Sequence, residues 1–311
     1  VYEDDPTTNE LERLAAQKLG MEAALFVSSG TMGNQLGIMV LTGRSDEIIV
    51  GSQSHIMLDE VGGPAVLAGV NMRALDFPQA IPDAAMIEAA IRPDDIHAPR
   101  TALICLENAL ANGRVVSLEI MDQVRQRANR RGLPIHLDGA RLFNAATALG
   151  VPANALTAKV DTVSCCLSKG LCAPVGAIFA GPKDIVRRAR KYRKLLGGGM
   201  RQTGILAAAG ILALNEMTER LHIDHENARY MSQRLSALPA VAIDVNAVDI
   251  NMVFFNINAP AETLAALPER MAAKGVRINP AEGNTFRWLT NNDVSKADVD
   301  TAVDALAELL S

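Results

Sequence analysis

The sequence predicts an α/β protein with a mostly parallel sheet covered by helices on both faces, followed by a small α+β domain. Apolar strand-like runs alternate with helix-period runs through the first two-thirds of the chain, which is typical of β-α-β units. After about Leu212 the pattern changes to a long helix and then to short strands and helices. At 311 residues, the chain also exceeds what one hydrophobic core usually holds. We therefore expect a large domain over residues 1–215 and a small domain over residues 216–311.

Each element is predicted from its periodicity and from the residues at its ends. In the large domain we expect strands over residues 24–28, 47–51, 72–77, 101–106, 134–137 and 162–167. The helices between them are expected over residues 9–19, from Thr31, over 82–91 and over 118–130. In the small domain we expect a long helical stretch over 205–234, strands over 242–245, 252–256, 276–278 and 286–289, and helices over 261–274 and from Lys296. Crossovers between parallel strands should be right-handed.

Charge and hydropathy exclude several kinds of partner. The formal net charge is -5 and the pI is about 5.6, so we expect neither a nucleic acid nor an anionic membrane as partner. The basic run at residues 187–194 is the exception, and we expect it to form a solvated or subunit-facing helix because Tyr192 is its only aromatic residue. No apolar stretch reaches the roughly 18 residues that a membrane span needs.

The cysteines indicate a reducing environment. Cys105, Cys165, Cys166 and Cys172 form no Cys-x-x-Cys pair, and no histidine stands at metal-ligand spacing from them, so we expect no metal site. Three of the four lie in apolar, strand-like runs and are expected to be small buried thiols. A cytoplasmic location fits. The first residues form no signal peptide and lack an initiator methionine, so we expect the chain to start inside a longer protein.

Polar residues follow several predicted strands, at the sheet edge where open α/β sheets bind ligands. Ser29, Gly30 and Thr31 stand between a strand and a helix, where backbone N–H groups and hydroxyls suit a phosphate. The same turn could serve as a plain helix N-cap. His55 follows the next strand, and both a catalytic and a structural role stay open for it.

Two charged residues end the following strands. Asp138 closes an apolar strand, and a buried aspartate needs a cationic partner, which could be a protonated pyridine nitrogen or Arg141. Lys169 ends another apolar strand. It could extend out to solvent, or it could form an imine with an aldehyde if a low-dielectric site lowers its pKa. A single crossover separates Asp138 from Lys169, so they should occupy neighbouring strand ends. Together these residues fit a pyridoxal phosphate (PLP) site.

Motifs spread along nearly the whole chain carry a family resemblance. They include Asp-Gly-Ala-Arg at residues 138–141, Ser-Lys-Gly-Leu at 168–171 and Gly-Gly-Gly-Met-Arg-Gln at 197–202. Further motifs lie at residues 3–9, 29–34, 54–56 and 287–290. In these motifs the sequence resembles the L-threonine aldolases, which belong to the β-eliminating-lyase superfamily. The fold that the resemblance implies is the aspartate-aminotransferase-like fold of the fold-type-I PLP enzymes.

The resemblance implies a role for each matching residue. Lys169 would carry the Schiff base to PLP, and Asp138 would pair with the pyridine nitrogen. His55 would lie against the cofactor ring and is also a candidate base for the substrate hydroxyl. The further residues that would contact the cofactor are Ser29, Gly30, Thr31, Arg141, Ser168 and Arg201. The substrate carboxylate would be bound by Arg141 and Arg287. The segment 197–202 would reach a neighbouring subunit's site, which implies a homodimer or homotetramer with sites at the subunit interface.

The activity implied is cleavage of a β-hydroxy-α-amino acid, such as L-threonine, L-allo-threonine or a phenylserine-like compound, to glycine and an aldehyde. β-Elimination, racemisation or transaldolation on the same bound amino acid is the alternative, and a non-catalytic PLP-binding protein is a second one. Leu110 stands where the family has a histidine thought to contact the substrate hydroxyl. Its loss would weaken hydroxyl recognition by about 1–3 kcal/mol and favour bulkier or more apolar substrates.

Overall fold

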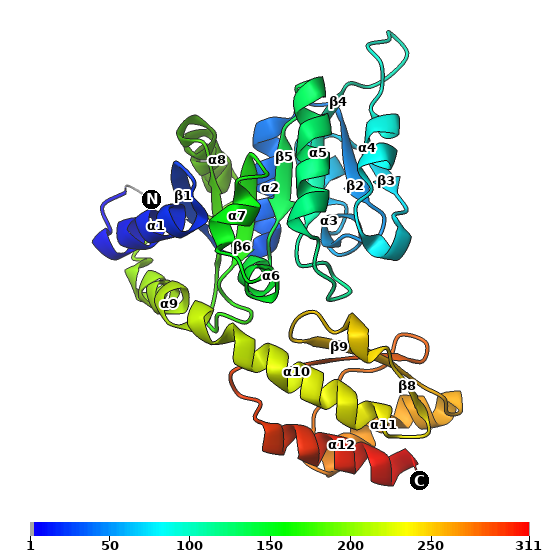
Figure 1. The fold of residues 1–311 in the computed structure, drawn as a ribbon. Helices are drawn as coiled ribbons and strands as arrows, with labels where there is room; N and C mark the ends of the chain where they lie inside the picture. Colours follow the sequence, from blue (N-terminus) through cyan, green and yellow to red (C-terminus); the bar gives the residue numbers. More distant parts are fainter. Residues whose placement is uncertain (1–2, 311) are drawn as a thin grey trace. The chain divides into compact units, whose positions relative to one another are not determined.

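A seven-stranded sheet organises the first of two units into which the chain divides (Figure 1). The structure is a computed structural model that describes residues 3–310. The first unit contains the chain up to Ala111 and Val115–Glu219, and the second contains Asn112–Arg114 and the chain from Arg220 onward. Each unit has its own hydrophobic core.

The large sheet is mostly parallel, as predicted. Its strand order is β1-β7-β6-β5-β4-β2-β3, and only β7 runs antiparallel to its two neighbours. The strands are β1 (Ala23–Val27), β2 (Glu47–Gly51), β3 (Asn71–Leu75), β4 (Thr101–Glu107), β5 (Ile135–Asp138), β6 (Thr162–Cys166) and β7 (Ala177–Gly181). Six of these match predicted strands. β7 was missed because it pairs with β6 through a short connection, so no helix separates the two apolar runs.

Helices cover both faces of this sheet (Figure 1). They are α1 (Pro6–Leu19), α2 (Gly30–Leu41), α3 (His55–Leu58), α4 (Ala84–Ala90), α5 (Leu118–Arg131), α6 (Leu142–Leu149), α7 (Ala153–Thr157), α8 (Lys183–Leu195) and α9 (Gly204–Asn215). Helix α2 packs across β5, β6 and β7 and against α8. Within residues 3–310, the structure contains no helix with the length and apolar character needed to span a membrane.

The start of α2 lies unusually close to β6. Ser29 caps the helix by accepting a hydrogen bond from the Met32 N–H group at 3.2 Å. A Cβ atom at Gly33 would lie 2.2 Å from Ser164 Oγ, and one at Gly30 would lie 2.7 Å from Cys166 Sγ. Only glycine fits at these two positions, and this close contact brings the helix N-terminus to the carboxyl end of β6.

The basic run at residues 187–194 lies on α8 and is partly internal. Arg193 is only 7% exposed, and its Nη1 donates to the Phe26 carbonyl oxygen at 2.6 Å. Arg190 bonds to the Glu12 carboxylate at 2.9 Å, and Arg188 to the Val40 carbonyl oxygen at 2.8 Å. The prediction of a solvated or subunit-facing helix is therefore wrong for Arg193, because its guanidinium satisfies a backbone carbonyl inside the unit.

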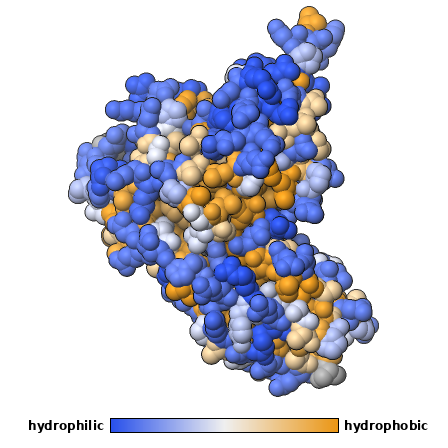
Figure 2. Space-filling view, in the orientation of Figure 1, coloured by the Kyte–Doolittle hydropathy of each residue, from blue (hydrophilic) through white to orange (hydrophobic). Residues whose placement is uncertain are grey.

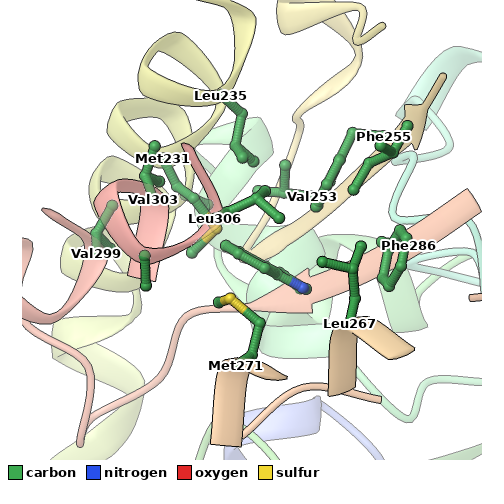
Figure 3. Close-up of a cluster of buried hydrophobic side chains, with 14 of the residues drawn as sticks. Met231, Leu235, Val253, Phe255, Leu267, Met271, Phe286, Val299, Val303 and Leu306 are labelled. Carbon is green, nitrogen blue, oxygen red and sulfur yellow. The ribbon is translucent and has the colours of Figure 1, made fainter. Parts of the chain in front are cut away.

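The second unit packs three helices on a small antiparallel sheet of order β10-β9-β8. Its elements are α10 (Leu221–Ser236), β8 (Val241–Ala242), β9 (Met252–Ile257), α11 (Ala261–Ala273), β10 (Thr285–Leu289) and α12 (Lys296–Leu310). Figure 3 shows how side chains from α10, α11 and α12 meet those of the sheet, and the Trp288 ring packs edge-on against Phe255 with their centroids 5.2 Å apart.

Two predictions in this part of the chain are wrong. The long helix expected over 205–234 is divided into α9 and α10 by a 3-10 turn at Met217–Arg220. The strand expected over 276–278 does not form, because Gly275 takes a left-handed conformation with φ 82° after α11 and the following residues stay irregular.

Gly33→Ala should destabilise the first unit by about 1–3 kcal/mol, because the new methyl group overlaps Ser164. Urea unfolding measures this loss. Gly43→Ala is the matched control, since a Cβ there meets only Asp46 at an ordinary 3.6 Å. Ser164→Ala in the Gly33→Ala background should recover part of the stability. Equal stability of both glycine variants would contradict the close contact between helix and strand.

Candidate active site

Four polar side chains converge at the carboxyl ends of adjacent strands in the first unit. His55 follows β2, Glu107 ends β4, Asp138 ends β5 and Lys169 follows β6. Because parallel strands present their carboxyl ends at the same edge, these residues come from one side of the sheet. Asp138 and Lys169 occupy neighbouring strand ends, which is the arrangement that the sequence predicted.

Asp138 is a buried carboxylate held by two hydrogen bonds. Its Oδ1 accepts from the Ala140 N–H group at 3.0 Å, and its Oδ2 accepts from Asn34 Nδ2 at 2.7 Å. The residue is only 3% exposed. A carboxylate has about four lone-pair positions, so these two bonds leave Asp138 able to accept a further donor such as a protonated ring nitrogen.

His55 begins α3 and is hydrogen-bonded to two glutamates. Its backbone N–H donates to Glu107 Oε2 at 2.9 Å, and its ring Nδ1 lies 3.0 Å from Glu60 Oε1. The hydrogen bond to Glu60 raises the pKa of His55, with a smaller contribution in the same direction from the Asp138 charge. Partial burial and the Lys169 charge oppose this rise in pKa. The ring is partly exposed, so His55 can face a ligand.

Asn34 connects the two sides of this cluster. Its Nδ2 donates to Asp138 and also to Glu60 Oε1, both at 2.7 Å. Its Oδ1 lies 3.2 Å from Nε2 of His136, whose Nδ1 meets Thr162 Oγ1 at 2.9 Å. Burial lowers the pKa of His136 to about 4, so this ring is neutral near pH 7.

Sequence reasoning missed the roles of Asn34, Glu60 and Glu107. Asn34 lies inside the motif at residues 29–34, and Glu107 ends a strand, so the sequence positions of these two residues pointed to the site. Glu60 follows no strand, and its burial at 3% exposure depends on how the chain folds back after α3.

Lys169 lies in the connection between the antiparallel strands β6 and β7. It is half-buried, and burial raises the pKa values of Glu107 and Cys166 while the Lys169 charge opposes that rise, so its amine lies near both. Within residues 3–310, the side chain has no ion pair or hydrogen-bond partner. The amine is therefore not committed to a structural contact.

The expected phosphate turn forms the N-terminus of α2 at the same sheet edge. Ser29 and Thr31 are exposed, and Ser164 Oγ donates to the Gly30 carbonyl oxygen at 3.2 Å. Ser29 is the N-cap of α2, so the turn does serve as a helix cap. The helix end also presents the Ser29 and Thr31 hydroxyls and backbone N–H groups, which suit an anion. A buried carboxylate, an uncommitted lysine and this helix end fit PLP.

The other predicted site residues come from several different elements of the fold. Arg141 precedes α6, and its charge, like that of Lys169, opposes the rise in the Cys166 pKa that burial causes, so it lies near the same strand end. Ser168 is exposed beside Lys169, and Arg201 is exposed between α8 and α9. Arg287 is exposed on β10 of the second unit, so its role rests on the family resemblance.

Among residues 3–310, one group has the composition of a metal site, namely His55, Glu60 and Asp138, with ligand atoms within 4.8 Å of one another. Asn34 donates to both carboxylates, and the His55 ring bonds to one of them. These hydrogen bonds account for the proximity of the three residues, and we interpret the group as a hydrogen-bond network.

Comparison with known proteins identifies the family. The sequence pattern of the β-eliminating lyases matches residues 1–258. The chain belongs to the β-eliminating lyase family. Among its relatives, the low specificity L-threonine aldolase of Escherichia coli K12 is 42% identical over 95% of this chain and 87% of its own length. A probable low-specificity L-threonine aldolase 2 of Arabidopsis thaliana is 39% identical over 99% of this chain and 89% of its own length.

Solved structures show that this β-eliminating lyase has the fold-type-I architecture, as predicted. A threonine aldolase from Leishmania major superimposes with a TM-score of 0.83 at 19% identity, covering 99% of this chain and 91% of its own. A serine palmitoyltransferase from Sphingomonas wittichii superimposes with a TM-score of 0.78 at 16% identity, covering 97% of this chain and 76% of its own.

Glu107 gives this β-eliminating lyase a measurable pH dependence. Burial and the Asp138 charge raise the pKa of Glu107 to about 8, against about 4.3 in an unfolded chain. The folded protein therefore holds this proton more tightly, and the resulting stability is lost progressively as the pH rises from about 4.3 to about 8. Glu107→Gln removes this loss. Urea unfolding between pH 5 and pH 9 should show the variant gaining on the wild type by up to about 1.4 kcal/mol per pH unit, with the difference levelling off above about pH 8.

A difference in unfolding free energy that stays constant with pH would mean that Glu107 is ionised throughout this range.

Proposed function

We propose that this protein is a PLP-dependent aldolase that cleaves a β-hydroxy-α-amino acid of the threonine type to glycine and an aldehyde. The observation that carries the proposal is the convergence of Lys169, Asp138 and His55 at one sheet edge. The relatives named low specificity L-threonine aldolase, at about 40% identity over nearly the whole chain, support the reaction class.

Residues of this site could bind the pyridine nitrogen, the aldehyde group and the phosphate of the cofactor. Asp138 would accept a hydrogen bond from the pyridine nitrogen, and the amine of Lys169 would bond to the aldehyde carbon. Ser29, Gly30 and Thr31 at the N-terminus of α2 would hold the phosphate, with Ser168 and Arg201 as further contacts. When bound, PLP supplies an electron sink for the pair released as a bond to the substrate Cα breaks.

The remaining residues orient the substrate and move its proton. Arg141 and Arg287 would bind the substrate carboxylate, because a guanidinium grips a carboxylate through two parallel hydrogen bonds. That grip would fix the orientation of the substrate, so that its Cα–Cβ bond is the one presented for cleavage. His55 would accept the proton of the β-hydroxyl group as the aldehyde leaves.

Leu110 bears on the choice of substrate. It is 5% exposed and follows Asn108, which is fully buried after β4 and bonded to Val116. A leucine offers no hydrogen bond to a β-hydroxyl group and accommodates an apolar substituent. We therefore expect phenylserine to be cleaved at least as efficiently as threonine.

β-Elimination, racemisation and transaldolation need the same carboxylate grip and the same lysine, so they remain the alternative within this family.

Lys169→Ala should abolish turnover and the absorption band of the lysine-bound cofactor, because no other group described at this site can form the imine. The measurement is the visible spectrum of the purified protein, followed by an assay of glycine and aldehyde from L-threonine, L-allo-threonine and phenylserine. Lys159→Ala is the control, since Lys159 pairs with Asp122 outside the site.

Three outcomes separate the hypotheses. Glycine and aldehyde in equal amounts support the aldolase. Consumption of the amino acid without glycine would favour one of the alternative reactions. A yellow protein that turns over none of these amino acids would favour a non-catalytic PLP-binding protein.

Arg287→Ala should lower kcat/KM about 10- to 150-fold, because a charge-assisted hydrogen bond contributes roughly 1.5–3 kcal/mol. The loss should appear mainly in KM, measured by steady-state kinetics with phenylserine. Arg270→Ala is the matched control, because Arg270 is exposed on α11 of the same unit. Unchanged KM in Arg287→Ala would remove Arg287 from the carboxylate site.

A homodimer or homotetramer with sites at the subunit interface completes the proposal. Large apolar side chains are exposed on the first unit, with Val61 at 95%, Ile205 at 82% and Val66 at 75% exposure. Figure 2 shows hydrophobic residues at the surface of this unit. Contiguous exposed apolar surface is typical of protein interfaces. A cytoplasmic location is supported by four free cysteines, three of them buried as predicted.

A further inference from the structure

We propose that Glu60 is a positioning residue that fixes which ring nitrogen of His55 accepts a proton from the substrate. This inference rests on the proposed function, since it assigns the proton-accepting atom to Nε2 of His55. Glu60 touches neither the substrate nor the cofactor in this assignment, and it acts only through the imidazole ring.

Glu60 is held so that one oxygen faces His55. Its Oε2 accepts from Gln35 Nε2 at 2.6 Å, and its Oε1 accepts from Asn34 Nδ2 at 2.7 Å. The remaining partner of Oε1 is His55 Nδ1 at 3.0 Å. The Glu60 side chain is fully buried, whereas that of His55 is 36% exposed. The carboxylate therefore cannot turn to solvent, and within residues 3–310 the imidazole is hydrogen-bonded through Nδ1 alone.

The direction of each hydrogen bond follows from the chemistry of the groups. An ionised carboxylate accepts hydrogen bonds and donates none, so His55 Nδ1 must carry a hydrogen in the bond to Glu60. In the neutral imidazole the other nitrogen, Nε2, then holds the free lone pair. When Nε2 takes a hydroxyl proton, the O–H bond breaks, an N–H bond forms and the imidazolium stays beside the Glu60 carboxylate.

The two carboxylates fix the orientation of the Asn34 amide, and the neutral ring of His136 fits that orientation. Burial holds His136 without charge, and its Nε2 meets Asn34 Oδ1 while its Nδ1 meets the Thr162 hydroxyl. With Oδ1 used in this way, Asn34 directs both hydrogens of Nδ2 at carboxylates, one at Glu60 and one at Asp138. The same amide therefore supports the ring base and the proposed pyridine partner.

Four charged or titratable groups act on His55 from the elements around it. Glu60 follows on the same segment, Asp138 lies on β5, Lys169 follows β6 and Glu107 ends β4. The Glu60 hydrogen bond is the largest of these influences on the ring. Glu107 contacts the backbone N–H of His55 and leaves the ring nitrogens alone. Because Glu60 bonds directly to Nδ1, it is the one of these four groups that both orients the ring and raises its pKa most.

The test compares wild-type holoenzyme with Glu60→Gln. Imidazole NMR of histidine-labelled protein reports the tautomer and the titration midpoint of His55, whose signal is assigned with His55→Gln. We expect Nδ1 to be protonated in the neutral wild-type ring and the midpoint to move to lower pH in Glu60→Gln. The acidic limb of the kcat/KM profile should move in the same direction, while the plateau falls by about 10- to 100-fold, less than the full contribution of a base.

Glu12→Gln is the matched control, because Glu12 is a buried glutamate that bonds to Phe26 and Arg190 away from His55. It should leave the His55 midpoint and the acidic limb where they are. A lower plateau in Glu60→Gln with a fixed acidic limb would reduce Glu60 to a structural residue and overturn the proposal. So would an unprotonated Nδ1 in the wild type, a measurement that does not depend on whether the variant folds.

The outcomes also separate this inference from the proposed function. If the tautomer and the midpoint behave as expected but no glycine is formed, the aldolase assignment fails and the role of Glu60 in fixing the ring stands. If glycine is formed and Glu60→Gln leaves the midpoint of His55 unmoved, the aldolase stands and the role of Glu60 fails.

Discussion

Two buried carboxylates share the amide group of Asn34, and the rest of the site is arranged around that shared bond. Removing Asp138 and Glu60 from water is costly unless donors replace the lost hydration. Asn34 supplies one hydrogen to each carboxylate, and Ala140 and Gln35 supply further donors. The His55 ring donates a further hydrogen bond to Glu60, and the proposed pyridine nitrogen would donate one to Asp138. The functional groups are thus also the groups that make the buried charges tolerable.

Close packing of α2 on the sheet makes this arrangement possible. Asn34 lies on α2, and it reaches the ends of the strands because Gly30 and Gly33 let the helix approach β6 without a Cβ between them. The same approach places the N-terminus of α2 at the sheet edge. One packing constraint therefore positions both the proposed phosphate turn and the amide that links the carboxylates.

Local signals in the sequence were sufficient for most of the fold and for part of the site. Asp138 and Lys169 could be predicted because each follows an apolar strand, and neighbouring parallel strands bring their ends together. Glu60 could not, since its burial depends on a return of the chain that no periodicity reveals. Strand β7 was missed for a related reason, as an antiparallel strand needs no intervening helix. Arg193 was misjudged because a basic run on a helix gives no sign that one guanidinium will turn inward to a carbonyl.

The charge of each buried group determines the direction of the whole network. If His136 were charged, both its nitrogens would donate, Thr162 would have to accept, and a third charge would enter a site that already holds two carboxylates. Its low pKa avoids this, and because Asn34 turns Nδ2 to the carboxylates, its Oδ1 accepts from Nε2 of His136. The hydrogens then point in order from His136 to Asn34, from Asn34 to Glu60 and Asp138, and from His55 to Glu60. These donors all end at the two carboxylates, and the Thr162 hydroxyl occupies Nδ1 of His136. Among residues 3–310, the network therefore leaves a ring lone pair on Nε2 of the partly exposed His55, where a substrate hydroxyl could reach it.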